Sequence, residues 1–190
     1  MARVIKNAIE EKNKNGQQFV LGLATGSTPL LVYRELIRLH KEEGLSFKNV
    51  ITFNLDEYYP ILHENPESYN YYMWNNLFHH IDIPKENVNI PDGEIERSQV
   101  TKFCEDYEKK IKSYGGIDIQ ILGIGRTGHI GFNEPPSPIN SCTRLVYLHR
   151  LTRKDASKAF KGIDNVPKAA ITMGINTIKE AKKIIIMAWS

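Results

Sequence analysis

The 190-residue sequence has few cysteines and no long apolar run. Its two cysteines, Cys104 and Cys142, match neither a metal-binding nor a redox spacing, and Cys104 falls on the apolar side of a predicted helix. No apolar run reaches the roughly 20 residues that a membrane-spanning helix needs. The charged N-terminus also lacks the apolar segment of a secretion signal. We therefore expect a cytoplasmic protein that has no membrane partner.

The sequence also lacks the clustered basic face that binds nucleic acid. Its 25 Lys and Arg residues are nearly balanced by 22 Asp and Glu residues, which gives a formal net charge of +3. The densest basic runs, 109–112 and 179–183, lie among acidic residues or beside predicted strands, as is typical of exposed helix surfaces. Nucleic acid is therefore not an expected partner. A hydrophobic content of 41% is ordinary for a globular domain.

Short apolar runs alternate with helical patterns along the whole chain. Six runs are predicted as strands: 18–23, 50–55, 117–124, 143–148, 169–173 and 183–189. Several have no polar alternation, which is typical of strands covered on both faces. Helices are predicted to open at Pro29, to follow the sequence NPES at 65–68, and to span residues 100–111. This order predicts an α/β fold whose mainly parallel sheet has helices on both faces.

The length suits one domain with a substantial core. The last pattern, KKIIIMAWS at 182–190, is a strand that stops almost as soon as it finishes. A buried parallel strand is ordinarily followed by a loop or a helix that covers it. We therefore expect one domain over residues 1–190 that is a fragment of a longer chain.

Ligands in such folds bind beyond the carboxyl ends of the strands. The first loop there, GLATGSTPLL at 22–31, combines a glycine and small hydroxyls with a helix start, where Thr28 suits the N-cap and Pro29 the first helical position. Backbone N–H groups at a positive helix end favour an anion. No Lys follows the glycine, so a phosphate on a small molecule fits better than a nucleoside triphosphate. The residues predicted to bind the phosphate are Thr25, Gly26, Ser27 and Thr28. The alternative is a capped helix without a ligand.

The second loop, ITFNLDEYYP at 51–60, places Asp56 and Glu57 at the end of a predicted strand. A carboxylate at that position can act as a general base over a bound substrate. The alternative is an acidic loop that caps the next turn.

The third loop, GIGRTGHIGFNEP at 123–135, begins like a dinucleotide-binding fingerprint. The glycines and prolines after Gly128 do not support the helix that such a site needs, and no acid follows about 20 residues later. The loop instead delivers His129 with Glu134, an acid–base pair whose spacing is not that of a metal site. We therefore expect neither a metal nor an organic cofactor.

The motifs GLATGSTP, FNLDEY, ESYNYYM and GIGRTGHIGFNEP resemble, in order and spacing, those of glucosamine-6-phosphate deaminases. The resemblance extends from about residue 17 to the last strand. It implies a Rossmann-like three-layer sandwich, a homo-oligomer, and an enzyme that converts glucosamine 6-phosphate and water into fructose 6-phosphate and ammonia. The Tyr and Trp residues of 69–74 are then expected in the core or at a subunit interface.

The resemblance also implies a role for each matching residue. Asp56 would move a proton between C2 and C1 of the opened sugar. His129, with Glu134 beside it, would take or give the proton in ring opening. Thr127 stands at the position of a family Asp in the same group, so that this group has one negative charge fewer. The loop 25–28 would bind the 6-phosphate.

Other positions depart from the family. Lys158 replaces an Arg that binds the phosphate, which keeps the charge but loses the bidentate fork. A second phosphate site of regulated members matches at Ser137 and Arg144 but has Val146 in place of a Lys, so we expect no such regulation. Two other functions stay open: an enzyme for another sugar phosphate or a lactone, and a non-catalytic sugar-phosphate sensor.

Overall fold

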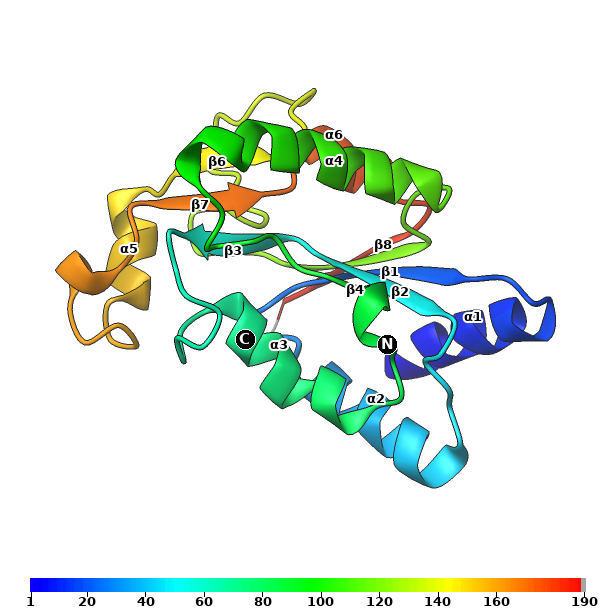
Figure 1. Ribbon diagram of the computed structural model, residues 1–190. Coiled ribbons are helices and arrows are strands. Elements are labelled where there is room, and N and C mark those ends of the chain that lie inside the picture. The colour runs from blue at the N-terminus through cyan, green and yellow to red at the C-terminus, as the bar shows by residue number, and fades with distance from the viewer. Residues whose placement is uncertain (189–190) are drawn as a thin grey trace.

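A parallel sheet of five strands runs through the centre of the computed structural model, which describes residues 1–188 (Figure 1). In spatial order its strands are β4 (Val88–Asn89), β2 (Val50–Asn54), β1 (Phe19–Leu23), β5 (Ile119–Gly123) and β8 (Ile184–Met187). Every neighbouring pair is parallel. The predicted mainly parallel sheet is confirmed; the predicted run 183–189 matches β8, and its last residue lies outside the described residues.

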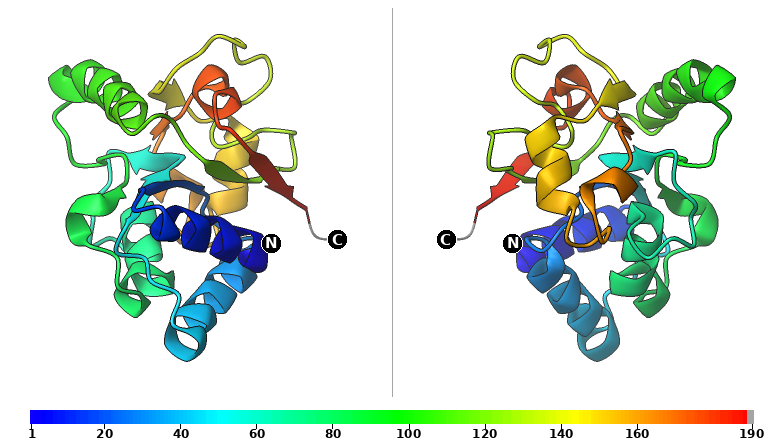
Figure 2. Two further views of the ribbon diagram at one scale, coloured as in Figure 1. Left: turned by 90° about the vertical axis from the view of Figure 1, so that its right-hand side faces the viewer. Right: turned by 90° about the vertical axis from the view of Figure 1, so that its left-hand side faces the viewer.

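Helices cover both faces of this sheet (Figures 1 and 2). One side has α1 (Ala2–Lys14), α2 (Leu30–Glu43) and α3 (Tyr69–Asn76), and the other has α4 (Val100–Ser113) and α6 (Ile175–Lys179). In β1, Phe19 and Leu21 pack in the core of the first side, while Val20 packs with α4 on the second. Consecutive apolar residues in β1 are therefore explained by burial on both faces.

Local sequence sets where the helices begin and which side they bury. Helix α4 buries Val100, Cys104, Tyr107 and Ile111, the helical repeat that the sequence predicts. Helix α3 begins after Ser68, whose hydroxyl accepts a hydrogen bond from the Tyr71 N–H at 2.9 Å. Helix α2 begins one residue later than predicted.

In α2, the N-cap is Pro29 rather than Thr28, and the first helical residue is Leu30. The capping role predicted for Thr28 is therefore wrong. The difference is one residue, because proline is compatible with the turn that precedes the helix as well as with the first helical position.

The two sequence-predicted runs 143–148 and 169–173 belong to a second sheet, which is separate from the parallel sheet. It contains β3 (Asp56–Tyr59), β7 (Ala169–Thr172) and β6 (Arg144–Tyr147), in that order and antiparallel. Both runs are strands as predicted, but neither joins the parallel sheet. The strand β3 was not predicted as a separate element.

Leu55 is the point at which the chain passes from one sheet to the other. Its N–H donates to the Leu23 carbonyl at 3.0 Å, and its own carbonyl accepts from the Met173 N–H at 2.7 Å. One residue thus links β2 to β3 without a turn, which explains why the sequence shows a single apolar run there. No helix within residues 1–188 has both the length and the apolar character needed to cross a membrane.

Candidate active site

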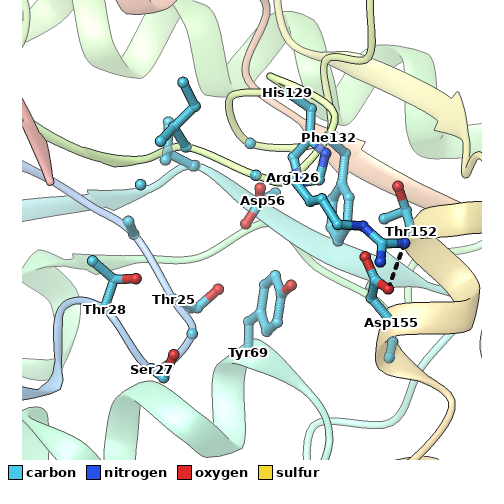
Figure 3. Close-up of a pocket in the computed structure, with 18 of the residues that line it drawn as sticks. Thr25, Ser27, Thr28, Asp56, Tyr69, Arg126, His129, Phe132, Thr152 and Asp155 are labelled. Atoms are coloured by element: carbon cyan, nitrogen blue, oxygen red, sulfur yellow. Dashed lines mark ion pairs between the residues drawn. The ribbon is translucent and has the colours of Figure 1, made fainter. Parts of the chain in front are cut away.

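A cavity of about 490 Å³ opens where β1, β2 and β5 end at their carboxyl sides (Figure 3). Its walls are the loop after β1, the start of β3, the loop after β5, and helix α5 (Arg150–Ala156). The polar side chains that line it are Thr25, Ser27, Thr28, Asp56, Tyr58, Tyr69, Arg126, His129, Thr152 and Asp155. All three loops predicted from the strand ends therefore meet at one space.

The loop after β1 is shaped to present backbone N–H groups. Gly26 adopts φ +96°, a conformation that favours glycine. The Tyr33 hydroxyl donates to the Ala24 carbonyl, and the Tyr72 hydroxyl donates to the Gly26 carbonyl at 2.6 Å. Because a trans peptide points its C=O and N–H in opposite directions, the N–H groups of Thr25 and Ser27 face away from these tyrosines. With the start of α2 behind it, the loop suits an anion.

Asp56 and Glu57 point to opposite sides of β3, because successive residues of a strand alternate. Asp56 lines the cavity and is 5% exposed, whereas Glu57 is 0% exposed. The Glu57 carboxyl accepts hydrogen bonds from the N–H groups of Tyr58, Tyr69 and Asn70 at 2.8, 2.9 and 2.8 Å. The capping alternative thus describes Glu57, which receives the first N–H groups of α3, while Asp56 faces the cavity.

Burial and, to a smaller extent, the nearby charge of Glu57 together raise the pKa of Asp56 to about 8. Within residues 1–188 the Asp56 side chain accepts no hydrogen bond that would stabilise its charged form. Burial also raises the pKa of Glu57, to about 7, against the three N–H donors that lower it. Asp56 therefore changes charge near neutral pH, as a general acid or base requires.

The loop after β5 comes close to Asp56 at Gly131. This residue has φ +58°, and a Cβ there would lie 3.1 Å from Asp56 Oδ2 and 2.9 Å from Thr172 Oγ1. The next residue, Phe132, donates its N–H to Thr172 Oγ1 at 3.2 Å. A glycine at 131 therefore allows the loop to pack against β3 and β7.

The first part of the same loop forms a tight turn, not the helix start of a dinucleotide site. The Gly128 N–H donates to the Gly125 carbonyl, and the Gly125 N–H donates to the His129 carbonyl, each at 2.9 Å. A Cβ on Gly125 would overlap the imidazole of His129. The glycines thus make room for the His129 ring beside the cavity, which agrees with the sequence-based rejection of a dinucleotide.

His129, Thr127 and Glu134 form one cluster in which His129 lines the cavity. Thr127 Oγ1 lies 2.8 Å from His129 Nδ1 and 2.7 Å from Glu134 Oε2, and His129 Nδ1 lies 3.4 Å from Glu134 Oε1. The Thr152 hydroxyl of α5 also donates to Glu134. Burial raises the pKa of Glu134, but hydrogen bonds from Thr152 and Thr127 and the nearby His129 outweigh it, so that the pKa is lowered overall.

Helix α5 adds two cavity residues that sequence patterns did not predict. Thr152 supports Glu134, and Asp155 forms an ion pair with Arg126 at 3.0 Å across the cavity edge (Figure 3). The helix is short and has no apolar repeat. A sequence feature that marks the start of this helix is His149, whose side chain caps it by accepting a hydrogen bond from the Leu151 N–H at 3.3 Å.

The remaining predicted residues lie as follows. Lys158 is exposed after α5 and is not among the cavity-lining residues. Tyr69, expected in the core or at an interface, lines the cavity and stacks on Phe132 with ring centroids 5.9 Å apart. The signal for Tyr69 was its place in the ESYNYYM motif. Within residues 1–188, no group of three or more His, Cys, Asp or Glu side chains is arranged to hold a metal ion.

Residues 1–189 match the family described as glucosamine-6-phosphate isomerases/6-phosphogluconolactonase. A glucosamine-6-phosphate deaminase of Clostridium botulinum is 53% identical over 169 residues, which is 89% of this chain and 68% of that protein. A glucosamine-6-phosphate deaminase-like protein of Bacteroides thetaiotaomicron is 50% identical over 97% of this chain. The chain spans only 28% of that longer protein.

A solved structure of a monomeric glucosamine-6-phosphate deaminase superposes with a TM-score of 0.91 at 46% identity. The match covers 97% of this chain and 74% of that one. The two proteins therefore share the same fold along almost the whole of this chain.

Proposed function

This chain belongs to the family of glucosamine-6-phosphate isomerases and 6-phosphogluconolactonases, and we propose that it converts glucosamine 6-phosphate and water into fructose 6-phosphate and ammonia. The relatives that match it at about half identity bear the deaminase name. The observation that carries the proposal is the meeting of Asp56, His129 and the loop 25–28 around one cavity.

The sugar phosphate would be held at its 6-phosphate by the loop after β1. The N–H groups of Thr25 and Ser27, the hydroxyls of the loop and the positive end of α2 favour a dianion at that place. Among the described lining residues, Arg126 and His129 are the only basic ones, so backbone groups supply much of the binding. A direct role of Lys158 stays a prediction.

Ring opening needs a group that moves a proton between the C1 hydroxyl and the ring oxygen. His129 faces the cavity and has Glu134 behind it. As O1–H loses its proton, the C1–O5 bond breaks and O5 gains a proton, which leaves the open-chain aldehyde. A carboxylate behind the ring stabilises the imidazolium that forms during this transfer.

Asp56 would then act on the aldehyde. Its carboxylate takes the proton from C2, the electrons form a C1=C2 double bond, and O1 gains a proton. Return of the proton to C1 leaves an imine at C2, to which water adds and from which ammonia departs. A raised pKa makes the ionised Asp56 a stronger base, because basicity rises with pKa.

The test is release of ammonia and formation of fructose 6-phosphate from glucosamine 6-phosphate. We expect both products from the wild type, none above background from Asp56→Asn, and unchanged turnover from Asp106→Asn, an exposed control on α4. Binding is followed in parallel as the rise in unfolding temperature with fructose 6-phosphate. Sugar-phosphate binding without ammonia release would contradict the deaminase and favour another substrate or a sensor. Equal turnover in Asp56→Asn would remove Asp56 from the reaction.

Three further properties are part of the proposal. We place the reaction in the cytoplasm, because a sugar phosphate does not cross a membrane unaided. We propose that residues 1–190 form one domain. The homo-oligomer stays a prediction, which the monomeric relative does not favour, and light scattering of the purified chain tests it.

A further inference from the structure

Thr127 lies between His129 and Glu134, and its hydroxyl has a single proton to donate to one of them. Its Oγ1 is 2.7 Å from Glu134 Oε2 and 2.8 Å from His129 Nδ1. Glu134 has a lowered pKa, so it is ionised near neutral pH and can only accept hydrogen bonds. The hydroxyl proton of Thr127 must therefore point to Glu134. What remains toward His129 is an oxygen lone pair, which requires a donor.

We infer that Thr127 is a positioning residue whose hydroxyl holds the proton of neutral His129 on Nδ1. The other ring nitrogen, Nε2, then has a free lone pair. This inference deepens the proposed function, because it states which nitrogen of His129 is available as the base in ring opening.

The opposite proton arrangement is disfavoured by the same distances. If Thr127 donated to His129 Nδ1, its oxygen and Glu134 Oε2 would face each other as two acceptors 2.7 Å apart. A direct bond from His129 to Glu134 does not replace the hydroxyl, since the 3.4 Å separation exceeds the usual hydrogen-bond range. Thr127 Oγ1 is therefore closer to each of these two side chains than they are to each other.

Thr152 and Gly125 help to orient the Glu134 and His129 side chains beside Thr127. The Thr152 hydroxyl donates to Glu134 Oε1, which directs Oε2 to Thr127. Gly125 has no side chain where the His129 ring lies, and a Cβ there would meet Cε1, Nε2 and Cδ2. The Nε2 edge of the ring thus lies along a backbone segment that lines the cavity.

The test is the protonation of each ring nitrogen of His129, measured by ¹⁵N NMR above the pH range in which histidine titrates. The wild type and Thr127→Ser are expected to carry the proton on Nδ1. Thr127→Val keeps the side-chain shape without the hydroxyl and is expected to lose this preference. The exposed His79 ring is an internal control that should not change.

Glu134→Gln gives the sharpest result. Thr152 would hold the amide oxygen, so the amide NH₂ would donate to Thr127, whose own proton would then turn to His129 Nδ1. The proton of the ring is expected on Nε2 in this variant, the reverse of the wild type. A wild-type proton on Nε2, or an Nδ1 proton that persists in Thr127→Val, would overturn the inference.

Turnover gives a second readout with a matched pair of variants. Thr127→Val is expected to lower kcat roughly 10- to 100-fold with little change in KM, since general-base steps contribute that much or more. Thr127→Ser should restore kcat to within about threefold, because it keeps the hydroxyl. The NMR measurement needs no substrate, so failure of the deaminase proposal and failure of this inference are separate outcomes.

Discussion

Two acids near the cavity, Asp56 at the start of β3 and Glu134 in the loop after β5, are held in opposite ways. Asp56 is 5% exposed and, within residues 1–188, its side chain receives no hydrogen bond, so that its pKa is raised to about 8. The Glu134 side chain is 22% exposed and accepts hydroxyl protons from Thr127 and Thr152, so that its pKa is lowered. Hydrogen-bond donors, and not burial alone, decide which acid stays charged.

The difference also separates two tasks. A group that takes a proton from carbon must change its charge during the reaction, and Asp56 is suited to this by its environment. A group that supports an imidazole must keep its charge, and Glu134 is suited to this by its donors. The pKa of Glu57, about 7, lies between those of Asp56 and Glu134. Glu57 is more deeply buried than either, but its carboxyl accepts hydrogen bonds from three backbone N–H groups.

The largest expected effect is on turnover, through Asp56. Asp56→Asn removes the proposed base and should lower kcat/KM roughly 10²- to 10⁴-fold. In the wild type, kcat/KM should rise with pH between about 6.5 and about 8.5, because the free enzyme must lose the Asp56 proton near pH 8. A profile that is flat over this range would break the contrast between the two acids.

The next effect concerns the loop that holds Glu134 and His129. In Gly125→Ala the new Cβ overlaps the His129 ring, so the ring must move and turnover should fall roughly 100-fold. Asp106→Asn, the exposed control on α4, should keep the turnover of the wild type. Steady-state rates of both variants test whether displacement of the His129 ring lowers turnover. Equal rates would show that turnover does not depend on the position of this ring.

A smaller effect is expected on stability. The folded state holds the Asp56 proton up to about pH 8, whereas the unfolded chain releases it near 3.8. This stabilisation is complete below about pH 4 and is lost as pH rises to about 8. The free energy of unfolding of the wild type should therefore fall, relative to that of Asp56→Asn, between pH 5 and pH 8.5. Urea unfolding at both pH values measures it; a constant difference would contradict the raised pKa.

The smallest effect comes from removing one donor from Glu134. Thr152→Val leaves this carboxylate with one hydroxyl fewer, so its pKa should rise toward the behaviour of Asp56, with a cost of about 1 kcal/mol in unfolding free energy. The carboxyl ¹³C shift followed against pH reports the change. Arg126→Gln, which breaks only an exposed ion pair, is the control and should leave that pKa in place.

Particular elements show why some features were predictable. The strands β1, β2 and β5 are buried on both faces, so their apolar runs were visible in the sequence, and their carboxyl ends meet at one edge of the sheet. The strand β3 was hidden because only Leu55 separates it from β2. Helix α5 was hidden because it has seven residues and no apolar repeat.

The sequence by itself determined the α/β class, and it predicted an anion-binding loop at 25–28 and roles for Asp56, His129 and Glu134, since these predictions follow from patterns within short segments. The tertiary structure decided which of Asp56 and Glu57 faces the cavity, and it joined Thr127 to His129 and Glu134 with Thr152 behind them. These features depend on the change of sheet at Leu55 and on contacts between distant segments. Their energies come from burial and hydrogen bonding in three dimensions, which local patterns do not encode.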